Sequence, residues 1–186
     1  MDFVKEHKII FGFIFVVILA SGIYTWSVIS KNRNATTEIS PAMRSLSVSG
    51  DDTPYTDLNG NSVSLSDFVG QVLVVNSWAS WSPASVNELK TLSVITNEYK
   101  DSSVKVIAIN RGEPANTAKS FLQTYSISED VMLVLDYDDR YFASIGGYNM
   151  PETVVYDTKG NIFHHERGAM SESKLRRIIS QAMAIQ

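Results

Sequence analysis

The chain has 186 residues, of which 44% are hydrophobic and 19% are charged, and its formal net charge is −4. This length allows one domain with a hydrophobic core, and the acidic balance argues against nucleic-acid binding, which depends on a basic patch. Cysteine is absent, which excludes a disulfide, a thiolate metal site and a cysteine nucleophile, and we expect no metal and no other cofactor.

Residues 1–8 form a short flank before residues 9–29, which read IIFGFIFVVILASGIYTWSVI and carry no charge. A helix of this length crosses a hydrocarbon core of about 30 Å, so we predict a retained, single-pass anchor in the cell membrane. The alternative is a cleaved signal peptide, because Ala20-Ser21-Gly22 forms a small-residue cleavage site. We favour the anchor because the apolar run continues past Gly22. Basic residues on the two sides nearly balance, and only the short first flank favours an extracytoplasmic position for the soluble domain.

The soluble part begins with a polar segment. Residues 30–50 have many small polar side chains and no apolar period, which is typical of a tether. Residues 51–186 are predicted to form one folded domain. Near its start, Asn59-Gly60 lies between Tyr55-Thr56 and the apolar stretch that begins at Val63, which predicts a hairpin with a two-residue turn.

Strand-like and helix-like segments then alternate along the chain. The apolar patterns predict strands at 72–75, 104–109 and 131–135, helices at 83–100, 115–125 and 138–145, a strand pair at 153–156 and 162–165, and a final helix at 171–183. Alternation favours parallel strands, and the closing strand pair adds antiparallel ones. The predicted fold class is therefore α/β, with a mixed central sheet flanked by helices on both faces.

The stretch WASWSPAS, residues 78–85, follows the first buried strand and precedes the first long helix. This arrangement resembles the thioredoxin-like superfamily, and it is most similar to the membrane-anchored TlpA/ResA-like thiol–disulfide oxidoreductases, or redoxins, of bacteria. The resemblance extends over about residues 51–183. Its other motifs are DLNG at 57–60, VSLSDF at 63–68, NEL at 87–89, Met150-Pro151 before a strand, and Asp157-x-x-Gly160.

The family motif W-C-x-x-C places cysteines where this chain has Ser82 and Ser85. The resemblance implies a thiolate at a helix N-terminus, where backbone N–H groups lower its pKa. A serine hydroxyl cannot take part in that chemistry, so we identify no catalytic residue. A structural interpretation makes Ser82 the N-cap, Pro83 the first helical residue, and Ser85 with Glu88 a capping box.

The resemblance also implies a cis peptide at Met150-Pro151, beside the motif. In the family this region exposes backbone that pairs with an extended polypeptide. We therefore expect Trp81, Pro83, Met150 and Pro151 to form a groove for a polypeptide partner in the cell envelope.

Other polar residues give weaker signals. His164 and His165 are adjacent on a predicted strand and so point to opposite faces, which argues against a shared metal and favours surface positions. Asp136, Asp138 and Asp139 are expected to lie in a loop that caps the next helix.

The sequence thus favours a membrane-anchored thioredoxin-like protein that is redox-inactive and binds protein partners. Two alternatives remain open at this stage. One is an oxidoreductase family member whose cysteines were substituted, and the other is a structural spacer in the cell envelope.

Overall fold

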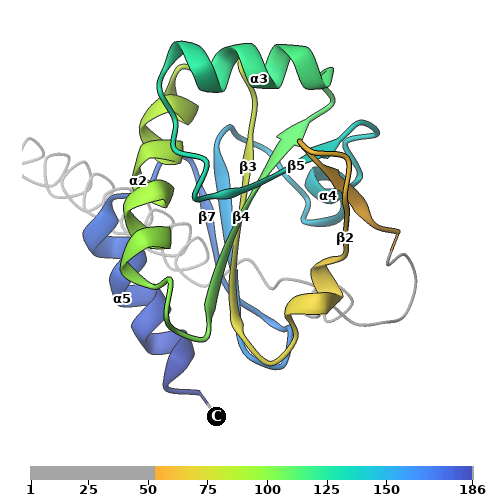
Figure 1. Ribbon diagram of the computed structural model, residues 1–186. Coiled ribbons are helices and arrows are strands. Elements are labelled where there is room, and N and C mark those ends of the chain that lie inside the picture. Colours follow the sequence, from red (N-terminus) through yellow and green to blue (C-terminus); the bar gives the residue numbers. More distant parts are fainter. Residues whose placement is uncertain (1–52, 186) are drawn as a thin grey trace, which may run out of the picture. The chain divides into compact units, whose positions relative to one another are not determined.

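The structure is a computed structural model that describes residues 53–185 (Figure 1). The predicted flank, anchor and tether at 1–8, 9–29 and 30–50 lie outside these residues. Within residues 53–185, none of the helices combines the length and the apolar character that a bilayer span requires.

Helices and strands follow the predicted order, and their ends shift by only a few residues. The elements are β1 (Tyr55–Asp57), β2 (Ser62–Val63), the 3-10 helix η2 (Leu65–Phe68), β3 (Val72–Trp78), α2 (Ala84–Glu98), β4 (Val104–Arg111), α3 (Ala115–Thr124), β5 (Met132–Asp136), α4 (Arg140–Ser144), β6 (Glu152–Tyr156), β7 (Ile162–Arg167) and α5 (Glu172–Met183).

The strands form one mixed sheet in the order β2-β1-β5-β4-β3-β6-β7. β3 runs parallel to β4, and β4 runs parallel to β5, whereas β6 lies antiparallel to β3 on its other side. The register pairs Ser77 with Glu152, so the carboxyl end of β3 lies beside the start of β6. This end of the sheet holds the WASWSPAS motif.

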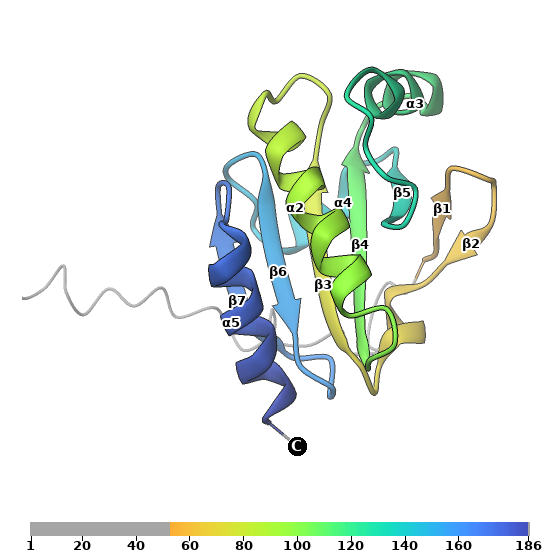
Figure 2. The ribbon, with the colours of Figure 1, turned by 60° about the vertical axis from the view of Figure 1, so that its left-hand side comes forward.

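Both faces of the sheet are covered, as the continuous apolar run in β3 predicts. Val72 and Val74 pack into one core cluster with residues of α2, α3 and α5, whereas Leu73 and Val75 pack on the other face with residues of α4. Figure 2 shows α2 and α5 together in front of the sheet and α4 behind it.

The predicted first hairpin is present in the structure, but the prediction of a two-residue turn is wrong. Tyr55 pairs with Val63, and the Asp57 amide donates to the carbonyl of Asn61, so the connection is longer. The Asp57 carboxylate causes this, because its Oδ1 accepts hydrogen bonds from the amides of Asn59 and Asn61 and organises a wider loop. Gly60 sits in that loop with φ of +91°, a conformation that glycine adopts at little cost.

Candidate functional site

Two loops meet at the carboxyl end of β3. The first connects Trp78 to α2 and contains Ser82, and the second, Tyr148 to Pro151, precedes β6. The Met150–Pro151 peptide is cis, as predicted. The Ser82 hydroxyl donates to the Met150 carbonyl at 3.4 Å, so the serine in the first cysteine position contacts the proline loop.

The predicted capping roles of the two serines are wrong. α2 begins at Ala84 after Pro83, and no side chain caps it. The Ser82 amide donates to the Ala79 carbonyl, so Ser82 belongs to a turn that precedes the helix. In this turn its hydroxyl donates to the Met150 carbonyl and not to an amide of the helix.

Ser85 lies in the first turn of α2 and is fully buried, with 0% exposure. Its hydroxyl has no hydrogen-bond partner among the described residues. An unsatisfied buried hydroxyl costs about 1–3 kcal/mol, whereas a buried thiol behaves as a small hydrophobic group. The surroundings of Ser85 therefore suit a sulfur atom better than the oxygen that is present.

Glu88, one turn further along α2, is also buried. Its carboxylate accepts hydrogen bonds from the Thr153 hydroxyl at 3.1 Å and from the Met170 amide at 2.9 Å. The predicted capping box with Ser85 is therefore wrong, because the helix turns Glu88 towards β6. The signal in the sequence was its spacing, since Glu88 precedes Leu92 and Ile95 by four and seven residues and so shares their inward face. Burial raises the pKa of Glu88 above its ordinary value, and the bonds from Met170 and Thr153 oppose this shift only in part.

Replacing Glu88 with Gln is expected to stabilise the protein at neutral pH. Because the pKa of Glu88 is higher in the folded than in the unfolded chain, folding favours the protonated carboxyl group. This contribution to stability is complete below the ordinary pKa of 4.5, and it is lost as the pH rises through the raised pKa of the folded state. A neutral amide keeps one acceptor oxygen and avoids that loss, so we expect Glu88→Gln to be the more stable chain at pH 7. Urea unfolding between pH 4 and pH 8 measures the difference. The gain should disappear near pH 4, and a gain that is constant with pH would contradict the assignment.

Asn76 lies on β3, two residues before Trp78, and is buried. Its Nδ2 donates to the Thr153 hydroxyl at 2.9 Å and to the Glu152 carbonyl at 3.3 Å. Thr153 in turn donates to Glu88, so a continuous polar chain connects β3, β6 and α2 beneath the two serines. Within residues 53–185, the Asn76 Oδ1 has no partner.

Glu113, in the connection after β4, holds the motif loop from the other side. Its Oε2 accepts hydrogen bonds from the Ser80 amide at 2.9 Å and from Asn110 Nδ2 at 2.7 Å, and its Oε1 accepts from the Ser80 hydroxyl at 2.5 Å. Sequence reasoning missed Glu113, because no local pattern links it to a loop 33 residues away.

The predicted groove residues differ in exposure. Trp81 is 63% exposed and Pro83 is also exposed, whereas Met150 is half-buried and Pro151 is buried. Tyr148, which the sequence did not single out, is 86% exposed in the same loop as Met150. A separate cavity of about 710 Å³ lies at the amino-terminal end of β5, lined among others by Leu58, Leu122 and Ile127, far along the chain from the motif.

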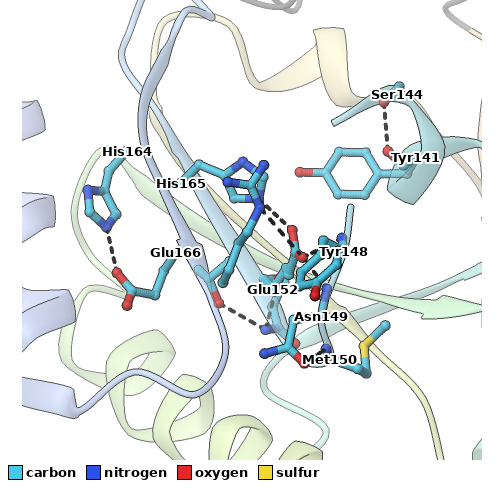
Figure 3. A network of polar contacts seen from close by, with 12 residues as sticks. Tyr141, Ser144, Tyr148, Asn149, Met150, Glu152, His164, His165 and Glu166 are labelled. Carbon is cyan, nitrogen blue, oxygen red and sulfur yellow. Dashed lines mark hydrogen bonds and ion pairs between the residues drawn. The ribbon is translucent and has the colours of Figure 1, made fainter. Parts of the chain in front are cut away.

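The two histidines point in different directions, as predicted. His164 Nε2 lies 3.0 Å from Glu166 Oε2, and His165 Nε2 lies 2.6 Å from Glu152 Oε2 (Figure 3). The expectation of two surface residues is wrong for His165, whose side chain is only 6% exposed, because cross-strand pairing turns it towards the carboxylate of Glu152. Among residues 53–185, no group of three potential ligands is suited to hold a metal ion.

Of the three aspartates predicted to lie in a loop that caps the next helix, only Asp136 caps α4, and it is the last residue of β5 rather than a loop residue. The Asp136 carboxylate accepts hydrogen bonds from the amides of Arg140 and Tyr141 at the start of α4. Asp139 instead pairs with Arg111 at the end of β4.

Comparison with known proteins explains this arrangement. The Redoxin family model matches residues 35–179, which is more than half of the chain. The chain belongs to the Redoxin family. Its resemblance to ResA-type members, which the motif predicted, is confirmed by curated relatives.

Thiol-disulfide oxidoreductase ResA of Halalkalibacterium halodurans is 28% identical over 116 residues, which cover 62% of this redoxin and 65% of that relative. ResA of Bacillus subtilis is 24% identical over 167 residues, which cover 88% of this chain and 86% of that one. The structure of MTB DsbF in mixed oxidized and reduced forms superposes with a TM-score of 0.65 at 20% identity, covering 77% of this chain and 98% of that chain. The thioredoxin-like α/β fold is thus confirmed.

Proposed function

We propose that this redoxin is a membrane-anchored, extracytoplasmic protein that binds a polypeptide partner and does not exchange disulfides. The observation that carries the proposal is the pair Ser82 and Ser85, which occupy both cysteine positions of a site whose other parts are in place. The helix start and the cis peptide at Pro151 are both present.

The chemistry of the two serines argues against redox turnover. Thiol–disulfide exchange requires a thiolate that attacks a disulfide sulfur and a second thiol that releases the mixed disulfide. A hydroxyl cannot form that intermediate, and two hydroxyls cannot store the electron pair that a dithiol carries. Glu88 does not change this, because both of its oxygens already accept hydrogen bonds from other groups.

The surface around the serines supports binding instead. Trp81 is a large aromatic side chain that is mostly exposed although it lies directly beside Ser82. Exposed tryptophan and tyrosine side chains are frequent anchors of protein interfaces. The neighbouring backbone at Met150 offers a carbonyl group to an extended segment, which is a common mode of peptide recognition.

The anchoring part of the proposal depends on the uncharged run at 9–29, whose length and hydrophobicity suit a transmembrane helix. A tether at 30–50 then gives the domain access to partners near the membrane.

Site-specific photo-cross-linking tests the binding role. We expect a photoreactive amino acid at position 81 of the full chain, in its native membrane, to give discrete protein adducts. The matched control position is Val69, which is 48% exposed but precedes β3 and therefore lies at the opposite end of that strand. Adducts at position 81 and none at 69 support a partner-binding site. Equal labelling at both positions, or none at 81, would favour a structural spacer.

A further inference from the structure

The loop before Pro151 is fixed by a carboxylate from the core. Glu152 is the first residue of β6, and it is completely buried. Its Oε1 accepts hydrogen bonds from the amides of Tyr148 at 2.6 Å and Asn149 at 2.5 Å. Figure 3 shows the Glu152 carboxylate between this loop and the ring of His165.

The second oxygen of Glu152 has its own partner on the edge strand. His165 Nε2 lies 2.6 Å from Oε2, and the guanidinium Nε of Arg167 lies 4.0 Å from Oε1. The neighbouring residue Gly168 donates its amide to the Pro151 carbonyl at 2.8 Å. β7 and the residue directly after it therefore hold both the Glu152 carboxylate and Pro151.

Burying the Glu152 carboxylate in order to fix this loop has a cost in free energy. Transfer of an ion from water into the protein interior costs several kcal/mol, and this loss is offset only when hydrogen bonds and an opposite charge surround the ion. Glu152 has two backbone N–H donors and a histidine ring nitrogen at hydrogen-bond distance, and the guanidinium of Arg167 supplies the opposite charge at 4.0 Å. Its immediate effect is to fix the backbone of Tyr148, whose side chain is the most exposed of the large hydrophobic and aromatic groups in the described chain at 86%.

A rigid backbone beneath an exposed tyrosine favours recognition. Tyrosine offers a large contact area with few rotatable bonds, and ordering its backbone in advance lowers the entropy lost on binding. Ser82 follows Trp81 in the motif loop and contacts Met150, which lies in the same loop as Tyr148. The hydrogen bond between Ser82 and Met150 therefore joins the loop of Trp81 to the loop of Tyr148.

We infer that Tyr148 is a partner-contacting residue of this site and that Glu152 and His165 are the positioning residues that hold it in place. This inference rests on the proposed binding function and extends it from Trp81 to the other loop. The partner is a polypeptide that presents an extended segment with an apolar or aromatic side chain to Tyr148.

Two measurements on the full chain test the inference. The first is amide hydrogen exchange at Tyr148 and Asn149 in detergent-solubilised protein. Glu152→Gln keeps one oxygen that can accept from both amides but removes the negative charge that strengthens these two hydrogen bonds, so we expect the amides of Tyr148 and Asn149 to exchange about tenfold faster. Glu166→Gln is the matched control, because Glu166 binds His164 and Lys174 on the same strand and does not bind the loop.

The second measurement is the yield of adducts from the photoreactive residue at position 81. We expect Glu152→Gln to reduce this yield several-fold, and Tyr148→Ala to reduce it as much without disturbing the core, since Tyr148 is exposed. If Glu152→Gln fails to fold, as exchange of the β3 amides reveals, Tyr148→Ala decides the question alone.

The outcomes separate the two proposals. Unchanged exchange at Tyr148 and Asn149 in folded Glu152→Gln, or an unchanged adduct yield in Tyr148→Ala, overturns the inference and leaves the binding site at Trp81 standing. An absence of adducts in the chain with Tyr148 and Glu152 intact overturns the proposed function itself, and the role of Tyr148 with it.

Discussion

Replacing Ser82 and Ser85 together with cysteine is expected to give this chain a reversible dithiol–disulfide couple. The Ser85 amide donates to the Ser82 carbonyl at 3.0 Å, so the two residues are the first and the last of one tight turn. Side chains three residues apart at a helix start are close enough for a disulfide. Ser82 is 5% exposed and Ser85 is 0% exposed, so the first cysteine would attack and the second would resolve.

The helix start should also activate the new thiol. Unpaired N–H groups at a helix N-terminus lower a cysteine pKa, and a value near 7 gives roughly tenfold more thiolate at pH 7 than a free cysteine has. Insulin reduction with dithiothreitol as the electron source measures the activity. We expect turnover from the double variant and only the background rate from the chain as it stands.

The single variant Ser82→Cys is the matched control for this experiment. It has an attacking thiol but no resolving partner, so with insulin and without dithiothreitol it should stop at a mixed disulfide that mass spectrometry detects. A double variant that never forms its internal disulfide would show that the two positions do not have redoxin geometry. Turnover by the unsubstituted chain would contradict the proposal that it is redox-inactive.

The two tryptophans of the WASW stretch are expected to respond very differently to truncation. Trp78 is 1% exposed, belongs to the main core cluster, and places its ring centroid 5.4 Å from that of Phe121. Its replacement by alanine should lower the free energy of unfolding by about 3–5 kcal/mol, through lost burial and a large cavity.

Trp81→Ala is the control, three residues further on. Its side chain is mostly exposed, so the change in stability should stay within about 0.5 kcal/mol, as is usual for surface substitutions. Urea unfolding followed by far-UV circular dichroism compares the variants. Similar losses for both would mean that Trp81 packs into the core, which would weaken its assignment to a binding surface.

Much of the fold could be predicted because its signals are local. The apolar runs of β3 and β4 and the helical spacing from Leu89 to Ile95 require no knowledge of tertiary partners. The closing hairpin likewise follows from two β-like runs around Thr158–Asn161. In each case the local run or spacing of apolar side chains marks the element, so it could be placed to within a few residues.

The polar contacts of the site could not be predicted in the same way, because they depend on strand register. Glu152 meets His165 only because β6 and β7 pair with Glu152 opposite Arg167 and Val154 opposite His165. A shift of one residue would turn the histidine to the other face. The first turn of α2 is a similar case, since Ser85 and Glu88 have the spacing of a capping box and only the packing of the helix against β6 turns both inward.

The contact between Ser82 and the Met150 carbonyl has a consequence for how easily the two loops can part. At 3.4 Å this hydrogen bond is long, and a carbonyl oxygen can accept a second donor on its other lone pair. The N–H group of a bound peptide can therefore donate to the Met150 carbonyl in place of Ser82. The Ser82 hydroxyl then donates to water or to the peptide. This exchange of hydrogen-bond donors occurs with almost no net change in hydrogen-bond free energy. Selectivity for a peptide that binds between the two loops must therefore come from its shape and its side chains.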